Sequence, residues 1–134
     1  MGEKMILENE NISVWYHDDL KIIHHKFHKF TSGGILKEAL NKELEAMRKY
    51  GITKVLSDDK ENPIMKKEDM AWTASVWRPA MISAGWKFWA IVLPELIAGQ
   101  MALKKIISEY AETGVTVQAF TDSNAALEWL KSRQ

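Results

Sequence analysis

Apolar and polar side chains alternate with a period of two through the first thirty residues, which is typical of β-strands. The alternation is clearest over residues 12–17, and Asp18 and Asp19 follow it with the composition of a turn. Residues 9–11 have a similar turn-like composition and precede it. The pattern predicts an antiparallel β-meander of three strands, over about residues 5–8, 12–17 and 21–30.

The period changes from two to about 3.6 at Thr31, where the spacing predicts an amphipathic helix over residues 32–50. The apolar stripe of this helix consists of Leu36, Leu40, Leu44 and Met47. We expect Thr31 or Ser32 to cap the first turn, and Gly51 to end the last turn in the left-handed conformation. The apolar stripe is then the face that packs against a sheet.

Three predicted helices end on a glycine and lead into a strand, at Gly51, Gly85 and Gly114. The strands that follow are predicted over about residues 54–57, 87–93 and 115–120, and each is followed by a polar or proline-containing segment. Strands that alternate with helices imply right-handed crossovers and a parallel sheet. The unbroken apolar run from Ala90 to Leu93 is typical of a strand covered on both faces, so we expect this strand to be central.

The remaining helices are predicted over about residues 67–84, 96–113 and 123–132. Pro79 lies inside the first of these and is expected to bend it, or to divide it into two segments near Arg78. No shift in composition marks a boundary along the chain. We therefore expect one α/β domain over residues 1–134, in which an N-terminal antiparallel β-meander continues into a mixed, mostly parallel sheet with βα units.

Composition argues against several kinds of function. Eighteen basic and 18 acidic side chains give a net charge of zero, so the chain lacks the basic character of a nucleic-acid binder. Cysteine is absent, which excludes disulfides and thiolate ligands and fits a reducing compartment. Met1–Lys4 does not begin a typical signal peptide, and the apolar stretch Phe88–Pro94 is too short to cross a bilayer. We expect a soluble cytoplasmic protein with no nucleic-acid partner and no membrane insertion.

Five segments of the chain carry a resemblance to a known family: Arg48–Gly51, Leu56–Asp59, Ala84–Glu95, Gly114–Gln118 and Ala126–Leu130. Together they resemble the SpoIIAA-like, or STAS-like, family of small bacterial proteins. The similarity extends over roughly Met5 to Leu130 and implies the family's fold, but no particular biochemistry. Anti-sigma-factor antagonists of this fold are switched by phosphorylation of a serine in an Asp-Ser-x-Gly element. Met65–Asp69 stands at the corresponding place and contains neither serine nor glycine, so the resemblance does not extend to that switch.

The best candidates for a site follow the parallel strands, because open α/β sheets bind ligands beyond the carboxyl ends of their strands. The candidate residues there are Ser57, Asp58, Asp59 and Asn62. The adjacent aspartates could act as an acid and base pair, or as oxygen ligands of a divalent cation. The alternative is an ordinary turn, since the spacing matches no calcium loop.

A second set of candidates comes from the central part of the chain. Trp72 and Trp86 are expected to frame a pocket with Arg78 and Lys87, which would suit a small anionic or amphipathic ligand. The alternative is that the aromatic rings pack against the sheet and the basic groups lie in solvent. Trp77 follows the helical spacing of Met70, Ala74 and Met81 and is predicted to be core.

The histidines do not predict a metal site. His24 and His28 share a strand face but lie ~13 Å apart, while His24 and His25 point to opposite faces. Adding His17 from the neighbouring strand does not complete a ligand set, so neither a metal nor another cofactor is expected. The outer sheet face, with Trp15, His17, His24 and His28, is alternatively a subunit interface.

These observations favour a non-enzymatic binding or regulatory module with the STAS-like fold, which acts through a protein partner or a small ligand. One alternative is an uncharacterised enzyme that uses Asp58 or Asp59 as a base, and another is a binder of small amphipathic molecules. Either site would lie at the carboxyl ends of the parallel strands. A homodimer is compatible with each of these functions.

Overall fold

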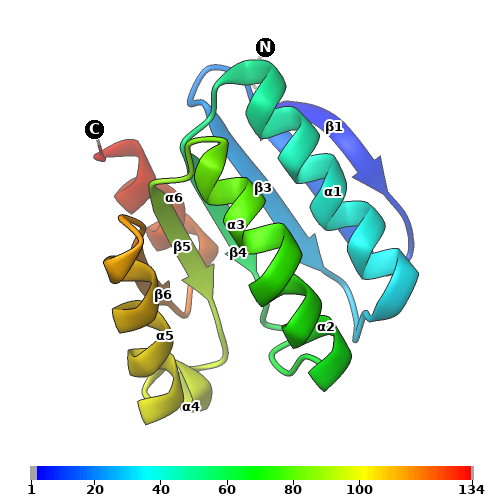
Figure 1. The fold of residues 1–134 in the computed structure, drawn as a ribbon. Coiled ribbons are helices and arrows are strands. Elements are labelled where there is room, and N and C mark those ends of the chain that lie inside the picture. Colours follow the sequence, from blue (N-terminus) through cyan, green and yellow to red (C-terminus); the bar gives the residue numbers. More distant parts are fainter. Residues whose placement is uncertain (1–2, 134) are drawn as a thin grey trace.

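A computed structural model describes residues 3–133 and contains a single six-stranded sheet (Figure 1). The strands lie side by side in the order in which the chain makes them. They are β1 (Glu3–Glu8), β2 (Ile12–His17), β3 (Ile22–Phe27), β4 (Lys54–Asp58), β5 (Phe88–Val92) and β6 (Thr116–Phe120). β1 to β3 pair antiparallel, and β3 to β6 pair parallel. The predicted meander that continues into a mixed, mostly parallel sheet is confirmed.

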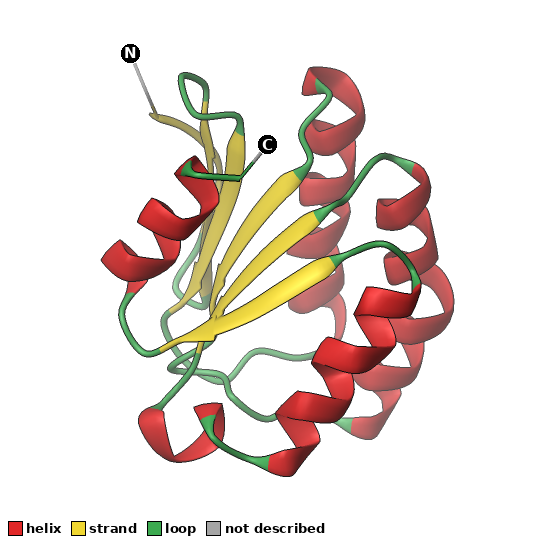
Figure 2. Cartoon of the chain, turned by 90° about the vertical axis from the view of Figure 1, so that its left-hand side faces the viewer, coloured by secondary structure: helices red, strands yellow, loops and turns green. Residues whose placement is uncertain are grey.

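The helices form two unequal layers around the sheet (Figure 2). They are α1 (Gly33–Tyr50), α2 (Lys67–Trp72), the π-helical turn η1 (Thr73–Trp77), α3 (Arg78–Ser83), α4 (Glu95–Ala98), α5 (Met101–Glu112) and α6 (Ser123–Lys131). α1, α3 and α5 lie over one face, and α6 lies on the other (Figure 1). Among residues 3–133, no helix is long and apolar enough to cross a membrane.

Strand alternation divides the buried side chains into two cores. The larger core lies beneath α1, α3 and α5 and includes Val14, Ile23 and Val55 from the sheet. The smaller core includes Leu56 and Ala90, which point the other way, and α6 covers it. α6 packs on β4, β5 and β6, so the outer face of the meander has less cover than the rest of the sheet.

The helix predicted over residues 67–84 is three consecutive helical segments. α2 leads directly into the π-helical turn η1, in which the Arg78 N–H donates to the Thr73 carbonyl, and α3 then begins. Pro79 is the physical reason, because it has no N–H to donate to the carbonyl one α-helical turn earlier. Widening the preceding turn to π geometry accommodates this missing hydrogen bond.

Two other expectations are corrected. The helix predicted over 96–113 is divided into α4 and α5, with Gly99 ending α4 and Gln100 preceding α5. The strand containing Ala90–Val92 is covered on both faces, as its apolar run predicts, but it is second from the edge instead of central. An apolar run indicates that both faces of a strand are buried. It does not indicate how many strands lie beside it in the sheet.

The start of α1 is capped from another part of the chain. Ser32 occupies the cap position, but neither its side chain nor that of Thr31 accepts a hydrogen bond from the first turn. The Gly33 N–H donates instead to both oxygens of Asp69 in α2, at 3.2 and 3.3 Å. The Thr31 N–H donates to Asn62 Oδ1 at 3.1 Å. The predicted local cap is therefore wrong, and a buried carboxylate from α2 replaces it.

Replacing Asp69 with alanine should destabilise the fold through α1. We expect the free energy of unfolding to fall by about 1–2 kcal/mol, the usual effect of losing a helix cap. Urea denaturation followed by circular dichroism measures this change. Glu68→Ala is the matched control because Glu68 is exposed, and it should change the free energy by less than about 0.5 kcal/mol. Equal losses in the two variants would contradict the role assigned to Asp69.

Candidate functional site

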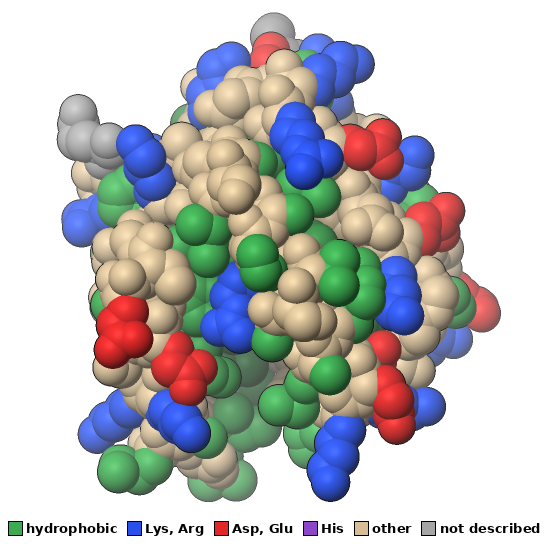
Figure 3. All heavy atoms as spheres, in the orientation of Figure 1, with side chains coloured by type: hydrophobic (Ala, Val, Ile, Leu, Met, Phe, Trp, Pro, Cys, Tyr) green, Lys and Arg blue, Asp and Glu red, His purple; other side chains and the backbone are tan. Residues whose placement is uncertain are grey.

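A cavity of about 610 Å³ lies over β3, β4 and β5, between the segment α2–η1–α3 and helix α5. Figure 3 shows hydrophobic side chains gathered in a hollow between these helices. The lining is mostly apolar, and its polar side chains fall into two sets. Thr73, Arg78, Gln100 and Glu109 come from the surrounding helical segments. His25, Ser57, Asp59 and Asn62 come from β3, from β4 and from the loop that follows β4. We call this second set the polar end of the cavity, because it lies at the carboxyl ends of the parallel strands, where α/β sheets usually bind ligands.

Four aromatic side chains form one continuous part of the cavity wall. Trp86 packs against Trp77, Trp89 and Tyr110, with ring centroids 5.4 to 5.5 Å apart, and Trp89 packs against Tyr110 at 4.9 Å. The three indole N–H groups already have acceptors, which are the Leu40 carbonyl, the Phe88 carbonyl and Ser57 Oγ. The wall thus offers aromatic surface without unsatisfied indole donors.

His25 lies between two carboxylates at the polar end. Its Nδ1 is 2.7 Å from Glu43 Oε2, and its Nε2 is 3.3 Å from Asp59 Oδ1. Glu43 comes from α1 and is fully buried, whereas the Asp59 side chain keeps 18% of its surface exposed. Ser57 joins the cluster, since its hydroxyl is 3.5 Å from Asp59 Oδ2 and accepts the Trp89 indole N–H at 2.6 Å.

The two carboxylates keep His25 protonated. Burial by itself lowers the pKa of His25, but the charge of Glu43 and the hydrogen bond and charge of Asp59 outweigh burial and raise it to about 10. The 2.7 Å contact between His25 Nδ1 and Glu43 Oε2 is a buried ion pair. Glu43 Oε1 has no hydrogen-bond partner among residues 3–133, so Glu43 depends on His25 for compensation of its charge.

The structure brings five of the predicted site residues to this cavity. Ser57, Asp59, Asn62, Arg78 and Trp86 all line it. The guanidinium of Arg78 lies over the Tyr110 ring, 4.8 Å from its centroid. These five residues, which the sequence placed in two separate candidate sets, thus line one cavity.

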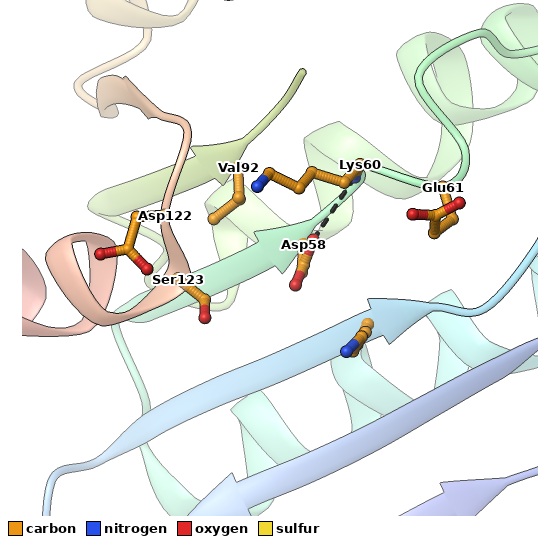
Figure 4. A pocket seen from close by; sticks show the side chains of 7 residues that line it. Asp58, Lys60, Glu61, Val92, Asp122 and Ser123 are labelled. Carbon is orange, nitrogen blue, oxygen red and sulfur yellow. Dashed lines mark hydrogen bonds between the residues drawn. The ribbon is translucent and has the colours of Figure 1, made fainter. Parts of the chain in front are cut away.

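Asp58 lies on the other side of the sheet from Asp59. Asp58 is the last residue of β4 and lines a separate polar pocket of about 230 Å³, shown in Figure 4. The Lys60 N–H donates to Asp58 Oδ1 at 3.4 Å, and Asp122 and Ser123 reach the same pocket from the start of α6. The structure thus does not bring the adjacent aspartates together as an acid and base pair, because successive side chains of a strand alternate between faces.

Two of the predicted pocket residues do not line the cavity. Lys87 is exposed and precedes β5, so it lies at the amino end of that strand, away from the polar end of the cavity. Trp72 is half-buried, and its ring lies 5.5 Å from Lys37 Nζ. Arg78 is therefore the member of the predicted basic pair that reaches the cavity.

Glu43 and His25 were not predicted as site residues, although the sequence contains a signal for one of them. Glu43 follows Leu40 by three residues and precedes Met47 by four, so it lies on the apolar stripe of its helix. An acidic residue on a buried stripe requires a partner. The partner is His25, which the period of β3 places on the same side of the sheet as α1.

The other histidines lie on the outer face of the meander. His17 Nε2 is 3.2 Å from His24 Nδ1, and His28 Nε2 is 2.7 Å from Ser13 Oγ. Burial, followed by the charges of His17 and His25, lowers the pKa of His24 to about 3. Within residues 3–133, no group of three or more acidic, histidine or cysteine side chains is placed to hold a metal ion.

Comparisons with protein-family models, with curated proteins and with solved structures gave no significant match to this chain.

The free energy of unfolding should fall as the pH rises from about 6.5 to 9. The raised pKa of His25, about 10, means that the folded protein keeps a proton which the unfolded chain releases above its ordinary pKa of 6.5. Stabilisation from this group is complete below pH 6.5 and is lost as the pH approaches 10. The decrease is at most about 1.4 kcal/mol per pH unit, measured by urea denaturation at successive pH values.

Two adjacent histidines provide the variant and its control. The double change Glu43→Gln, His25→Gln removes the titrating group together with the buried carboxylate that it compensates, and it should flatten this dependence. His24→Gln should retain the dependence, because His24, with a pKa of about 3, is already neutral throughout this range. A dependence that persists in the double variant, or that disappears in His24→Gln, would assign the titration to another group.

Proposed function

We propose that this protein is a non-enzymatic binding module which holds a small amphipathic molecule in the cavity between α3 and α5. The observation that carries the proposal is the cavity itself, whose volume of about 610 Å³ falls in the usual range of ligand pockets. Its lining combines a large apolar surface with a smaller number of polar groups, four of which form the polar end. This is the combination that holds a ligand by burial and orients it by hydrogen bonds.

The apolar body of the ligand would lie against the aromatic wall and the apolar side chains of α5. Leu103 and Ile106 face the cavity from α5, and Ile91 and Val55 form part of its floor. Removing this surface from water favours binding by about 25 cal/mol for each Å² buried. The polar group of the ligand would then meet Asp59 and Asn62 beyond the end of β4.

A specific observation supports an enzyme as the second candidate. Asp59 faces the cavity from the strand end and is partly exposed, as a general base must be. The first candidate is preferred because the Asp59 carboxylate is already in contact with the protonated His25 and accepts the Ser57 hydroxyl. Ser57 is a poor nucleophile candidate, since the neighbouring imidazole already holds both protons and cannot accept another.

Membership of the STAS-like family remains a proposal of ours. The order of helices and strands, and the mixed sheet in which a meander precedes the parallel strands, support it. Fold alone does not imply a function, so the binding proposal depends on the cavity and would stand without the family. A regulatory role would follow if the ligand altered contacts with a protein partner.

Filling the mouth of the cavity should abolish binding. Ala102 lines the cavity from α5 and is exposed, so Ala102→Trp adds bulk there without disturbing a buried contact. We expect the Kd of the neutral probe N-phenyl-naphthylamine, measured by its fluorescence, to rise at least about tenfold, or about 1.4 kcal/mol. Ala111→Trp is the matched control, because Ala111 is exposed on the same helix and does not line the cavity. Failure of the wild-type protein to bind the probe or any amphiphile would contradict the proposal.

A homodimer through the outer face of the meander is a separate proposal. Met5 is 49% exposed there, beside the half-buried Trp15 with which it pairs across β1 and β2. Light scattering should then give about twice the chain mass of 15.4 kDa, and Met5→Lys should return it to the mass of one chain. A wild-type mass of one chain at high protein concentration would contradict this proposal.

A further inference from the structure

We infer that the polar group of the ligand is a protonated amine, which Asp59 binds at the polar end of the cavity. This inference rests on the proposed function and specifies the chemical class of the ligand. Three observations support it independently. They are the unused hydrogen-bond acceptor positions of the Asp59 carboxylate, the balance of charge around the cavity and the position of the Trp89 ring.

Asp59 retains hydrogen-bonding capacity that the protein does not use. A carboxylate has about four acceptor positions. His25 Nε2 and the Ser57 hydroxyl use two of them, through long contacts of 3.3 and 3.5 Å. The remaining positions belong to a side chain that lines the cavity and is 18% exposed. A ligand that donates hydrogen bonds can use them, whereas a carboxylate or phosphate cannot.

Acidic side chains at the cavity outnumber basic ones by one. Glu43 backs the polar end, and the charged side chains that line the cavity are His25, Asp59, Arg78 and Glu109. Even with His25 protonated, acids outnumber bases, and Glu43 already balances His25 through the 2.7 Å ion pair. The cluster of Glu43, His25 and Asp59 therefore carries one net negative charge at the polar end of the cavity. A cation is favoured there, because the apolar surroundings strengthen the attraction between opposite charges.

Arg78 is the alternative anchor, and it would favour an anionic ligand. Its guanidinium is already placed 4.8 Å from the centroid of the Tyr110 ring, at the wall formed by α3 and α5. The charged groups of Arg78 and Glu109 both act on the Tyr110 hydroxyl. Burial raises the pKa of Tyr110, the positive charge of Arg78 lowers it, and the negative charge of Glu109 raises it. The negative charge of Glu109 therefore partly cancels the attraction of Arg78 for an anion at this wall. Among the described residues, His25 is the basic side chain that lines the polar end of the cavity.

The aromatic wall also suits a cation. Trp89 is held at the polar end by the 2.6 Å hydrogen bond from its indole N–H to Ser57 Oγ. An ammonium group near Asp59 would therefore lie close to an indole ring, and tryptophan is the aromatic side chain that attracts cations most strongly. The apolar part of the ligand would continue along Trp86 and Tyr110, which pack in sequence beside Trp89.

Three amphiphiles with the same ten-carbon chain test the inference. Decylamine, decanol and decanoate present a cationic, a neutral and an anionic group at neutral pH. Each is titrated below its aggregation concentration against wild-type protein that holds N-phenyl-naphthylamine, and displacement of the probe gives a Kd. We expect decylamine to bind at least about tenfold more tightly than decanol, the effect of one charged hydrogen bond, and decanoate to bind most weakly.

The adjacent aspartates provide a matched pair of variants. Asp59→Asn should raise the Kd of decylamine at least about tenfold and leave the Kd of decanol within about threefold of the wild-type value. Asp58→Asn removes the same charge one residue earlier but in the separate pocket across the sheet, so it should preserve the wild-type ranking. The ranking of the three amphiphiles on wild-type protein needs no variant, so the test holds even if Asp59→Asn fails to fold.

The outcomes separate this inference from the proposed function. Absence of binding by all three amphiphiles and the probe would overturn both. If decanol or decanoate bound with an affinity equal to or higher than that of decylamine, the amine inference would be overturned. The proposed binding function would not be affected. An equal loss of affinity for decylamine in Asp58→Asn and Asp59→Asn would also overturn the inference. It would show that the affinity depends on the net charge of the protein and not on a contact with Asp59.

Discussion

The ion pair between Glu43 and His25 is the interaction on which the inner part of this protein depends. It joins the middle of α1 to the middle of β3, and both side chains are buried. Removal of one partner would leave an uncompensated buried charge, which usually destabilises a protein by about 3–5 kcal/mol. The pair also orients the imidazole, because Glu43 holds Nδ1 and thereby directs Nε2 toward Asp59. A contact that stabilises the packing of α1 therefore also shapes the polar end of the cavity.

The loop that follows β4 is held by contacts on both of its sides. The Asp59 N–H donates to the Val92 carbonyl at 2.9 Å, which fixes the start of the loop to the end of β5. Asn62 accepts the Thr31 N–H, and Asp69 accepts the Gly33 N–H, which tie the loop and α2 to the start of α1. The polar end of the cavity is thus positioned by hydrogen bonds from backbone N–H groups that do not require a ligand, as a preorganised site needs.

The cavity and the π-helical turn share the same segment of chain. Thr73, Ala74 and Trp77 belong to η1, and all three line the cavity. The wider turn changes the direction of side chains along the helix, and such turns occur frequently at functional sites. Pro79 causes the irregularity, so a residue outside the cavity lining determines how α2 and α3 present their side chains to it.

The sequence by itself determined the elements of this protein, because hydrophobic periodicity and glycine at helix ends are local signals. It located the meander, the glycine at which α1 ends (Gly51, φ +65°), the disturbance at Pro79 and the strand ends that hold Ser57, Asp59 and Asn62. Only the tertiary structure decided that Trp72 and Lys87 do not line the cavity and that Asp69 caps α1. It also paired Glu43 with His25, residues far apart in the chain. The reason is physical: a local pattern specifies which face a side chain occupies, whereas its partner is set by the packing of distant elements.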